Sequence, residues 1–400
     1  MTRFPADRTD WPLILLLWTT GLLVASQFAK VTLTLDSLQL LYAGAPVAYA
    51  VSGVAVVGIL GGAMAGFVVA RFGLRHAVLW ACGLSAVLAL AQGMALPFWA
   101  YMTLRIAEGV GHLLFVVALP TLMASRARAA DRSVVMGLWG TFFGVGYALM
   151  AVIVPPVEAW GGLRAVFVGH GLLLVAVFPL LWWALPRGII AKRTPVPDPV
   201  EIHRRIYTNP RLAASGLGHG TYTALFIALV AFLPAALGAA WLLVVLPVAN
   251  LLGTFAAGFL ARHVAAPRLV VWGFGISALL FAAMALSGLP AVAVLAFLVT
   301  GVVAGGNFAA VPLLNDAPRD QALANGAMAQ LGNIGTFSGT PLFALVAGSL
   351  WGLAGLSIVI CIFGVIVAGY VYRMAARDCP TSAPTGQLRH IAERKVSGPS

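Results

Sequence analysis

The chain has 400 residues, of which 61% are hydrophobic and only 9% are charged. Soluble globular chains carry roughly 25% charged residues, and disordered chains combine low hydrophobicity with high net charge. The composition therefore excludes a soluble enzyme, a nucleic-acid module or a secreted disulfide scaffold, and it indicates a polytopic membrane protein. The net charge of +12 fits such topology without a nucleic-acid partner, because cytoplasmic loops of membrane proteins collect Lys and Arg.

Apolar stretches that could cross a membrane follow one another along the whole chain. A spanning helix needs about 20 mostly apolar residues, and the longest uncharged stretches, 212–261, 269–315 and 321–372, divide at turn residues into two spans each. The first apolar run is too long for a signal-peptide core and is expected to stay as a span. The sequence predicts twelve spans, at 12–35, 44–70, 77–95, 98–124, 134–156, 163–185, 211–235, 240–261, 268–287, 290–314, 322–347 and 352–373.

The distribution of positive charge predicts the orientation of these spans. With both termini in the cytoplasm, 21 of the 24 Lys and Arg residues fall on the cytoplasmic side. The opposite orientation would place nearly all of them outside, against the usual bias. We therefore expect a multi-pass protein of a bacterial-type inner (plasma) membrane with both termini cytoplasmic.

The chain is expected to divide into two similar halves. A polar loop at 186–210 separates a six-helix bundle at 1–185 from a second one at 211–373, and a disordered cytoplasmic tail is predicted at 374–400. The halves repeat at a shift of about 190 residues, since Gly62–Arg71 (GAMAGFVVAR) corresponds to Gly253–Arg262 (GTFAAGFLAR). Parallel repeats of six spans are typical of transporters, whose binding site lies near the midplane between the halves. The predicted fold class is an all-α membrane protein of two pseudo-symmetric bundles.

Two short motifs resemble those of the major facilitator superfamily. The loop after the second span is similar to the family pattern G-x-x-x-D-R-x-G-R-R, in which Ala70 replaces the Asp; the matching positions are Gly66, Arg71, Gly73 and Arg75. The fourth span matches R-x-x-x-G-x-G with Arg105, Gly109 and Gly111. The resemblance covers all twelve spans, and the run from Leu104 to Gly146 is also similar to a bacterial branch that includes cyanate-type carriers.

This resemblance implies transport by alternating access, in which the two bundles rock about a site lined by the first, fourth, seventh and tenth spans. It implies that Gly66, Arg71, Gly73 and Arg75 form a cytoplasmic gating motif, although Ala70 leaves the role of the family's acidic contact open. The family's antiporter pattern G-x-x-x-G-P-x-x-G is matched only in part, because Val145 stands at the Pro position. That departure disfavours drug/proton antiport.

Ionisable residues inside the predicted spans are the main candidates for a transport site, because burying them in a membrane is costly. Arg105, Glu108 and His112 are spaced by three and four residues and so share one face of the fourth span. Arg105 would hold a charged solute or tune Glu108, and Glu108 or His112 would carry a proton. The alternative is a local Arg–Glu pair that neutralises itself and stabilises packing.

Further candidates lie in the first, seventh and tenth spans. Lys30 either extends to the outer interface or lines the cavity mouth, and Gln27 lies one turn earlier. The remaining candidates are His219, Tyr222 and Asn307, for which hydrogen-bonded packing is the alternative. His170 is assigned to packing because the sixth span is expected to be peripheral.

The expected function is secondary active transport. The sequence has no phosphate-binding loop, no zinc-protease motif and no nucleophile elbow, so neither an enzyme nor a cofactor is predicted. The two positive charges of Lys30 and Arg105 outnumber the one negative charge of Glu108, which favours a small organic or inorganic anion as the solute. Whether its transport is coupled to protons stays open. The alternatives are a proton-antiporting exporter of amphiphilic drugs and a non-transporting sensor or assembly factor. The expected partners are a small solute and the lipid bilayer, with no nucleic acid, and the chain is expected to be a monomer.

Overall fold

The computed structural model describes residues 8–47, 49–187 and 198–377, and the regular structure in these ranges is helical. The helices are α1 (Trp11–Leu33), α2 (Leu35–Leu41), α3 (Tyr49–Phe72), α4 (Leu74–Gln92), α5 (Phe98–Arg126), the 3-10 turn η1 (Ala129–Asp131), α6 (Arg132–Gly140), α7 (Phe142–Ala184), α8 (Pro199–Tyr207), α9 (Pro210–Ala236), α10 (Leu242–Leu260), α11 (Ala266–Ser287), α12 (Pro290–Leu314), α13 (Pro318–Ala344) and α14 (Leu350–Arg377).

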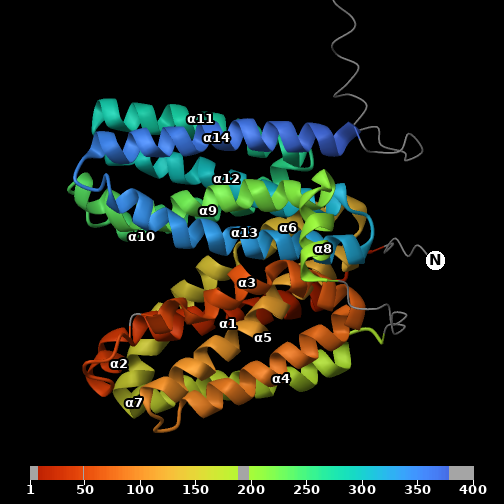
Figure 1. Ribbon diagram of the computed structural model, residues 1–400, viewed down its shortest axis with the longest axis vertical. Helices are drawn as coiled ribbons and strands as arrows, with labels where there is room; N and C mark the ends of the chain where they lie inside the picture. Colours follow the sequence, from red (N-terminus) through yellow and green to blue (C-terminus); the bar gives the residue numbers. More distant parts are fainter. Residues whose placement is uncertain (1–7, 48, 188–197, 378–400) are drawn as a thin grey trace, which may run out of the picture.

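The long helices form two bundles that lie side by side (Figure 1). Helices α1 to α5 and α7 make up the N-terminal bundle, and α9 to α14 make up the C-terminal bundle. Helix α6, between α5 and α7 in the chain, packs mainly against α10 and α12 of the C-terminal bundle. Short α8 lies in the loop between them and buries Ile202 and Ile206 one turn apart, while the Asp198 side chain caps its first turn. The sequence did not predict this helix, because prolines and charges around it resemble an irregular loop.

The structure confirms the predicted twelve crossings when the break in α7 and the polar helix α13 are taken into account. Within the described ranges, ten segments are long and apolar enough to span a membrane by hydropathy alone. One of them, Ala129–Ala184, crosses twice, because Gly161 and Gly162 break the helix and Gly162 adopts a φ of 64°. Helix α13 supplies the last crossing; its Gln and Asn side chains lower its hydropathy, and Gln321, Asn325 and Gln330 are buried. Ten segments, the second crossing of α7 and α13 make twelve.

Several predicted boundaries move in the structure. The second span begins at Tyr49 rather than at 44, because Gly44 adopts a φ of 83° and Pro46 follows it in the turn. Helix α14 continues to Arg377, so the residues from 374 to 377 are helical rather than part of a tail. The rest of the predicted tail, residues 378–400, lies outside the described residues.

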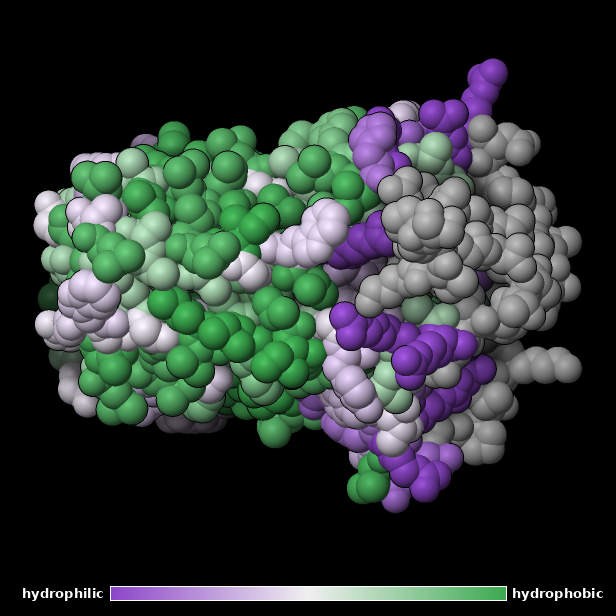
Figure 2. All heavy atoms as spheres, turned by 90° about the horizontal axis from the view of Figure 1, so that it is seen from above, coloured by the Kyte–Doolittle hydropathy of each residue, from purple (hydrophilic) through white to green (hydrophobic). Residues whose placement is uncertain are grey.

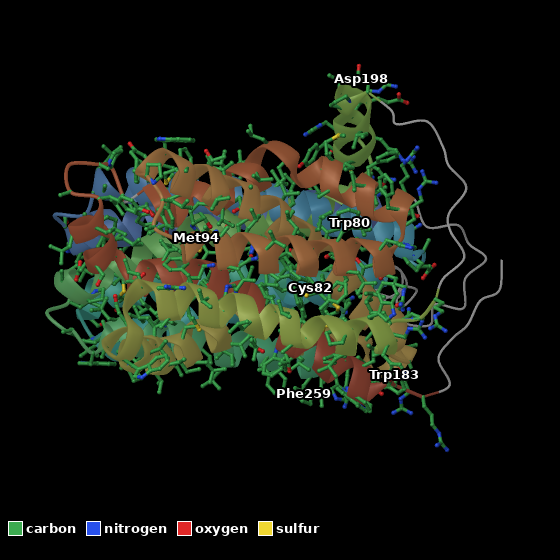
Figure 3. The ribbon with its side chains drawn as sticks, turned by 90° about the horizontal axis from the view of Figure 1, so that it is seen from below. Trp80, Cys82, Met94, Trp183, Asp198 and Phe259 are labelled. Atoms are coloured by element: carbon green, nitrogen blue, oxygen red, sulfur yellow. The ribbon has the colours of Figure 1, made fainter. Side chains whose placement is uncertain are left out.

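The surface separates into an apolar belt and a polar end. Figure 2 shows hydrophobic side chains along most of the molecule and hydrophilic ones gathered at one end. Trp183 and Asp198 lie at that end, and Met94 lies toward the opposite one (Figure 3). We call the polar end the arginine-rich end, because Arg71, Arg128, Arg262 and Arg373 lie at or next to helix ends there. A belt of this kind is what a bilayer requires.

The two bundles are in contact near the arginine-rich end. Gly66 of α3 lies against α13 so closely that a Cβ there would be 2.6 Å from the Ala322 carbonyl oxygen. The Asn325 amide of α13 donates a hydrogen bond to the Thr121 hydroxyl of α5 at 2.9 Å. Asp131, which follows α5, forms an ion pair with Arg262 at 3.0 Å. The structure is therefore closed at this end.

The residues of the predicted gating motif have different environments in the structure. Gly66 is the one that the structure places against the other bundle. Gly73 adopts a φ of 89° and begins α4. Arg75 donates hydrogen bonds to the Leu185 and Trp182 carbonyl oxygens at the end of α7, and Arg71 lies over the Phe72 ring. The Arg75 side chain therefore links α4 to the end of α7 within one bundle.

Substituting Gly66 with Ala should weaken the closed interface. The new Cβ would collide with the backbone of α13, and overpacking of this kind typically costs about 1–3 kcal/mol. In a background without the native cysteines, maleimide labelling of Asn325→Cys, which replaces a residue only 3% exposed, should increase several-fold. Gly355→Ala on α14 is the matched control, since a Cβ there has nothing within 4 Å. Unchanged labelling in Gly66→Ala would contradict the close packing.

Candidate functional site

A cluster of three charged side chains is buried inside the N-terminal bundle. The Lys30 ammonium of α1 lies 2.8 Å from Glu108 Oε1 of α5, and Arg105 Nη1 pairs with Glu108 Oε2. All three residues are 0% exposed. The Gln92 amide of α4 also donates to Glu108 Oε2, at 2.9 Å. Buried charges persist only when they are paired and hydrogen-bonded, so this cluster holds α1, α4 and α5 in register.

The prediction that Lys30 extends to the outer interface is wrong, because its side chain is fully buried. Its ammonium lies 3.2 Å from His170 Nδ1 and 5.1 Å from the centre of the Phe167 ring, both on α7. The Lys30 position faces the inside of the bundle, where the Glu108 carboxylate stabilises the charge more directly than distant solvent. His170 in turn lies 2.9 Å from the Leu23 carbonyl oxygen, which fixes the ring beside Lys30.

Apolar side chains close the cluster from solvent. Short α2 and the turn after it bring Leu38 and Val47 against Tyr101 and Phe167, which are all buried. Removing water lowers the local dielectric and strengthens each charge interaction. The cluster is therefore a low-dielectric site rather than a surface ion pair.

The cluster carries a surplus positive charge and unused polar atoms. Lys30 and Arg105 oppose the single Glu108 carboxylate, so the formal sum is +1 with both histidines neutral. Arg105 Nε donates to the Ala50 carbonyl oxygen at 3.1 Å, but Arg105 Nη2 and Tyr101 Oη have no hydrogen-bond partner among the described residues. Unpaired buried donors next to a surplus cation favour an anionic or other acceptor ligand.

A second polar pair extends the cluster toward the surface. His112 lies one turn after Glu108 on α5, and its Nδ1 is 2.9 Å from Gln27 Oε1 of α1. Gln27 Nε2 donates to the Ser85 hydroxyl of α4 at 3.0 Å. His112 is half-buried, whereas Glu108 is fully buried. The structure thus brings five sequence candidates together: Gln27, Lys30, Arg105, Glu108 and His112.

The candidates of the C-terminal half lie apart from this cluster. The His219 ring packs against the rings of Phe308 and Tyr222 at 5.1 and 5.6 Å. Tyr222 donates to Asn250 Oδ1 at 2.8 Å. Asn307 is 0% exposed and accepts a hydrogen bond from Tyr372 of α14 at 2.9 Å. These contacts favour the packing alternative for Tyr222 and Asn307, because their polar atoms join helices of the same bundle.

Sequence reasoning did not single out Gln92, and it assigned His170 to packing rather than to the site. Lys30 lies within about two turns of the end of α1, and His170 lies within about two turns of the break in α7, both away from the arginine-rich end. A comparison of their depth in the membrane could therefore have paired them. Gln92 gave no such signal, because the rotation of α4 about its axis decides whether its amide reaches Glu108. No group of three His, Cys, Asp or Glu in the described ranges could hold a metal ion.

Two apolar bundles, an interface closed at one end and a sealed charge cluster define a multi-pass membrane transporter. The family profile described as Major Facilitator Superfamily matches residues 13–235, which is more than half of the chain. The chain belongs to the Major Facilitator Superfamily. It is therefore a transporter and not an enzyme. No curated protein resembles the chain closely enough in sequence to count as a relative.

Solved structures share the fold at low sequence identity. The proton:xylose symporter XylE bound to 6-bromo-6-deoxy-D-glucose is 18% identical, with a TM-score of 0.69 and coverage of 91% of this chain and 95% of that chain. The E. coli fucose:proton symporter FucP is 14% identical, with a TM-score of 0.68 and coverage of 91% and 99%. The human organic anion transporter MFSD10 (TETRAN) is 14% identical, with a TM-score of 0.67 and coverage of 90% and 98%.

The charge balance of the cluster predicts an asymmetric mutation series. Glu108→Gln leaves two buried cations without a carboxylate and should lower the free energy of unfolding by about 3–5 kcal/mol. Lys30→Met leaves the Arg105–Glu108 pair intact and should cost less. The double variant returns the formal charge of the cluster to +1, so its cost should be well below the sum of the two. Melting temperatures in detergent would measure the series, and strictly additive effects would contradict a coupled cluster.

Proposed function

We propose that this transporter moves a small organic or inorganic anion together with protons, and that Glu108 is the proton-carrying group. The observation that carries the proposal is the sealed cluster of Lys30, Arg105 and Glu108, with its surplus positive charge. We include small inorganic anions in the proposed substrate set, because the run from Leu104 to Gly146 resembles a branch that includes cyanate-type carriers.

The charge balance supplies a physical reason for coupling. Protonation of Glu108 alone would raise the formal sum of the cluster from +1 to +2, which is costly in a low-dielectric site. A monovalent anion bound near Arg105 would return the sum to +1. Anion binding and protonation of Glu108 therefore favour each other, and by linkage the coupling is reciprocal. The expected result is symport of the anion with a proton.

The surroundings of the cluster support a proton route. His112 is half-buried and lies one helical turn from Glu108. Gln27 of α1 contacts both His112 of α5 and Ser85 of α4. A histidine exchanges protons readily near neutral pH, so His112 would pass protons between solvent and Glu108. XylE and FucP, which share the fold, are described as proton symporters, and MFSD10 is described as an organic anion transporter.

The proposed cycle uses the interface near the arginine-rich end as one gate. Contacts at Gly66 and the ion pair between Asp131 and Arg262 would separate as the bundles rock, opening the site to the other side. Placement in the plasma membrane with the arginine-rich end cytoplasmic, and action as a monomer, are part of the proposal. In that orientation the closed end faces the cytoplasm.

Proteoliposomes with an imposed pH gradient and a panel of small anions would test the proposal. Wild type should accumulate one anion as protons flow down their gradient. Glu108→Gln should lose this accumulation but keep exchange of labelled for unlabelled anion, because the cation remains. Arg105→Gln should weaken anion binding about 30-fold or more, since losing one partner of a buried charge pair costs about 2–5 kcal/mol.

Matched substitutions outside the cluster provide the controls. Glu158→Gln on α7 removes a carboxylate and Arg164→Gln removes a guanidinium, and neither residue contacts the cluster. Both controls should transport like wild type. Proton-driven accumulation that survives Glu108→Gln would refute the coupling role, and anion flux indifferent to Arg105→Gln would refute the anion site.

One observation favours the drug-exporter alternative. Aromatic rings lie next to His112: Phe28 packs against it at 5.0 Å and against Phe143 at 5.8 Å, and Tyr147 lies 5.0 Å from Phe143. Aromatic faces suit an amphiphilic cation. Efflux of such a compound that is unaffected by Arg105→Gln would select this alternative. A stable protein partner without solute flux would instead select the sensor.

A further inference from the structure

A pocket of about 280 Å³ lies at the arginine-rich end of the C-terminal bundle, away from the transport site. It is formed where α9 and α11 begin and where α12 and α14 end, and α11 and α14 run side by side at this face (Figure 1). Its basic rim consists of Arg211, Arg268 and Arg373. Its walls are apolar, with Val271, Leu313 and Ala376 among the residues that line them.

Among the described residues, none of these three arginines forms an ion pair with a carboxylate. Within the described part of the chain, the arginines that form ion pairs are Arg105, Arg128 and Arg262. Arg211 is oriented by a hydrogen bond from its Nε to the Leu314 carbonyl oxygen at 2.7 Å. Arg268 is half-buried and Arg373 is exposed. Three cations around one pocket, with no carboxylate paired to them among the described residues, favour binding of an anion from outside the protein.

The aromatic residues of α11 and α14 place this rim at the level of lipid headgroups. Trp272, one turn after Arg268, is 56% exposed, and Tyr370, one turn before Arg373, is 64% exposed. Exposed Trp and Tyr mark the boundary between headgroups and hydrocarbon. The arginines therefore lie on the headgroup side of that boundary, and the exposed Ile276 and Ile366 lie on the hydrocarbon side.

The wall of the pocket leaves room for an acyl chain. Gly369 of α14 lines the pocket, and a Cβ built on it would have nothing within 4 Å. The open space thus continues from the basic rim toward the lipid-facing surface of α11 and α14. A free phosphate or a soluble anion would use the arginines but not this apolar space.

We propose that this pocket binds one anionic phospholipid, with its phosphate on Arg211, Arg268 and Arg373 and an acyl chain beside Gly369. Basic pockets between spanning helices commonly hold anionic headgroups. The ligand would join the ends of α9, α11 and α14, which belong to one rigid half of the transporter. The proposal is independent of which solute is transported.

Native mass spectrometry of the full chain, titrated with dioleoyl-phosphatidylglycerol in detergent, would test the site. Wild type should retain one copy of this lipid and should prefer it over dioleoyl-phosphatidylcholine. Each arginine near an anionic lipid contributes about 1 kcal/mol, or about fivefold in affinity, so Arg268→Gln with Arg373→Gln should weaken retention about 30-fold. Arg377→Gln removes a charge from the same end of α14 but does not line the pocket, and it should bind like wild type.

A second variant keeps every charge and tests the acyl part of the pocket. Gly369→Trp should fill the open space and reduce retention of phosphatidylglycerol while leaving the protein folded, because a helical glycine is being replaced by a better helix former. Equal retention of phosphatidylglycerol and phosphatidylcholine would overturn the proposal. So would full retention in both pocket variants, or displacement of the lipid by inorganic phosphate alone with no effect of Gly369→Trp.

Discussion

The Glu108 carboxylate pairs with two cations that the bundle could not otherwise bury. Lys30 and Arg105 come from different helices, and both converge on its two oxygens, while Gln92 supplies a further hydrogen bond. In a region without water, an unpaired ammonium or guanidinium would cost several kcal/mol. The position of α1 relative to α4 and α5 therefore depends on one carboxylate. Protonation of Glu108 would weaken the contacts that join these three helices.

Close backbone approach between helices is the second constraint on the structure. Gly66 lets α3 touch α13 of the other bundle, and Gly301 lets α12 touch the α10 backbone within its own bundle. Lipid supplies no hydrophobic drive between helices, so small residues and hydrogen bonds hold them together. The two halves meet through close glycine contacts such as that of Gly66, through hydrogen bonds such as Asn325 to Thr121, and through the ion pair of Asp131 with Arg262.

Much of the architecture was predictable because hydropathy and charge act locally along a membrane chain. The count of twelve crossings, the two halves and the pairing of Arg105 with Glu108 all followed from spacing. Short α2 and α8 did not, because neither is long enough to span and each owes its position to packing against longer helices. Helix α13 was predicted as a span from its lack of charge, although its buried amides lower its hydropathy.

The sequence by itself determined which segments cross the membrane and which ionisable residues had to be explained, because burying a charge or an unpaired backbone group in lipid is costly. Only the tertiary structure decided how those residues were satisfied. It turned Lys30 inward to Glu108, placed His170 beside it, and directed Asn307 to Tyr372. These outcomes depend on the rotation of each helix about its axis and on its neighbours, and a linear pattern of residues carries neither.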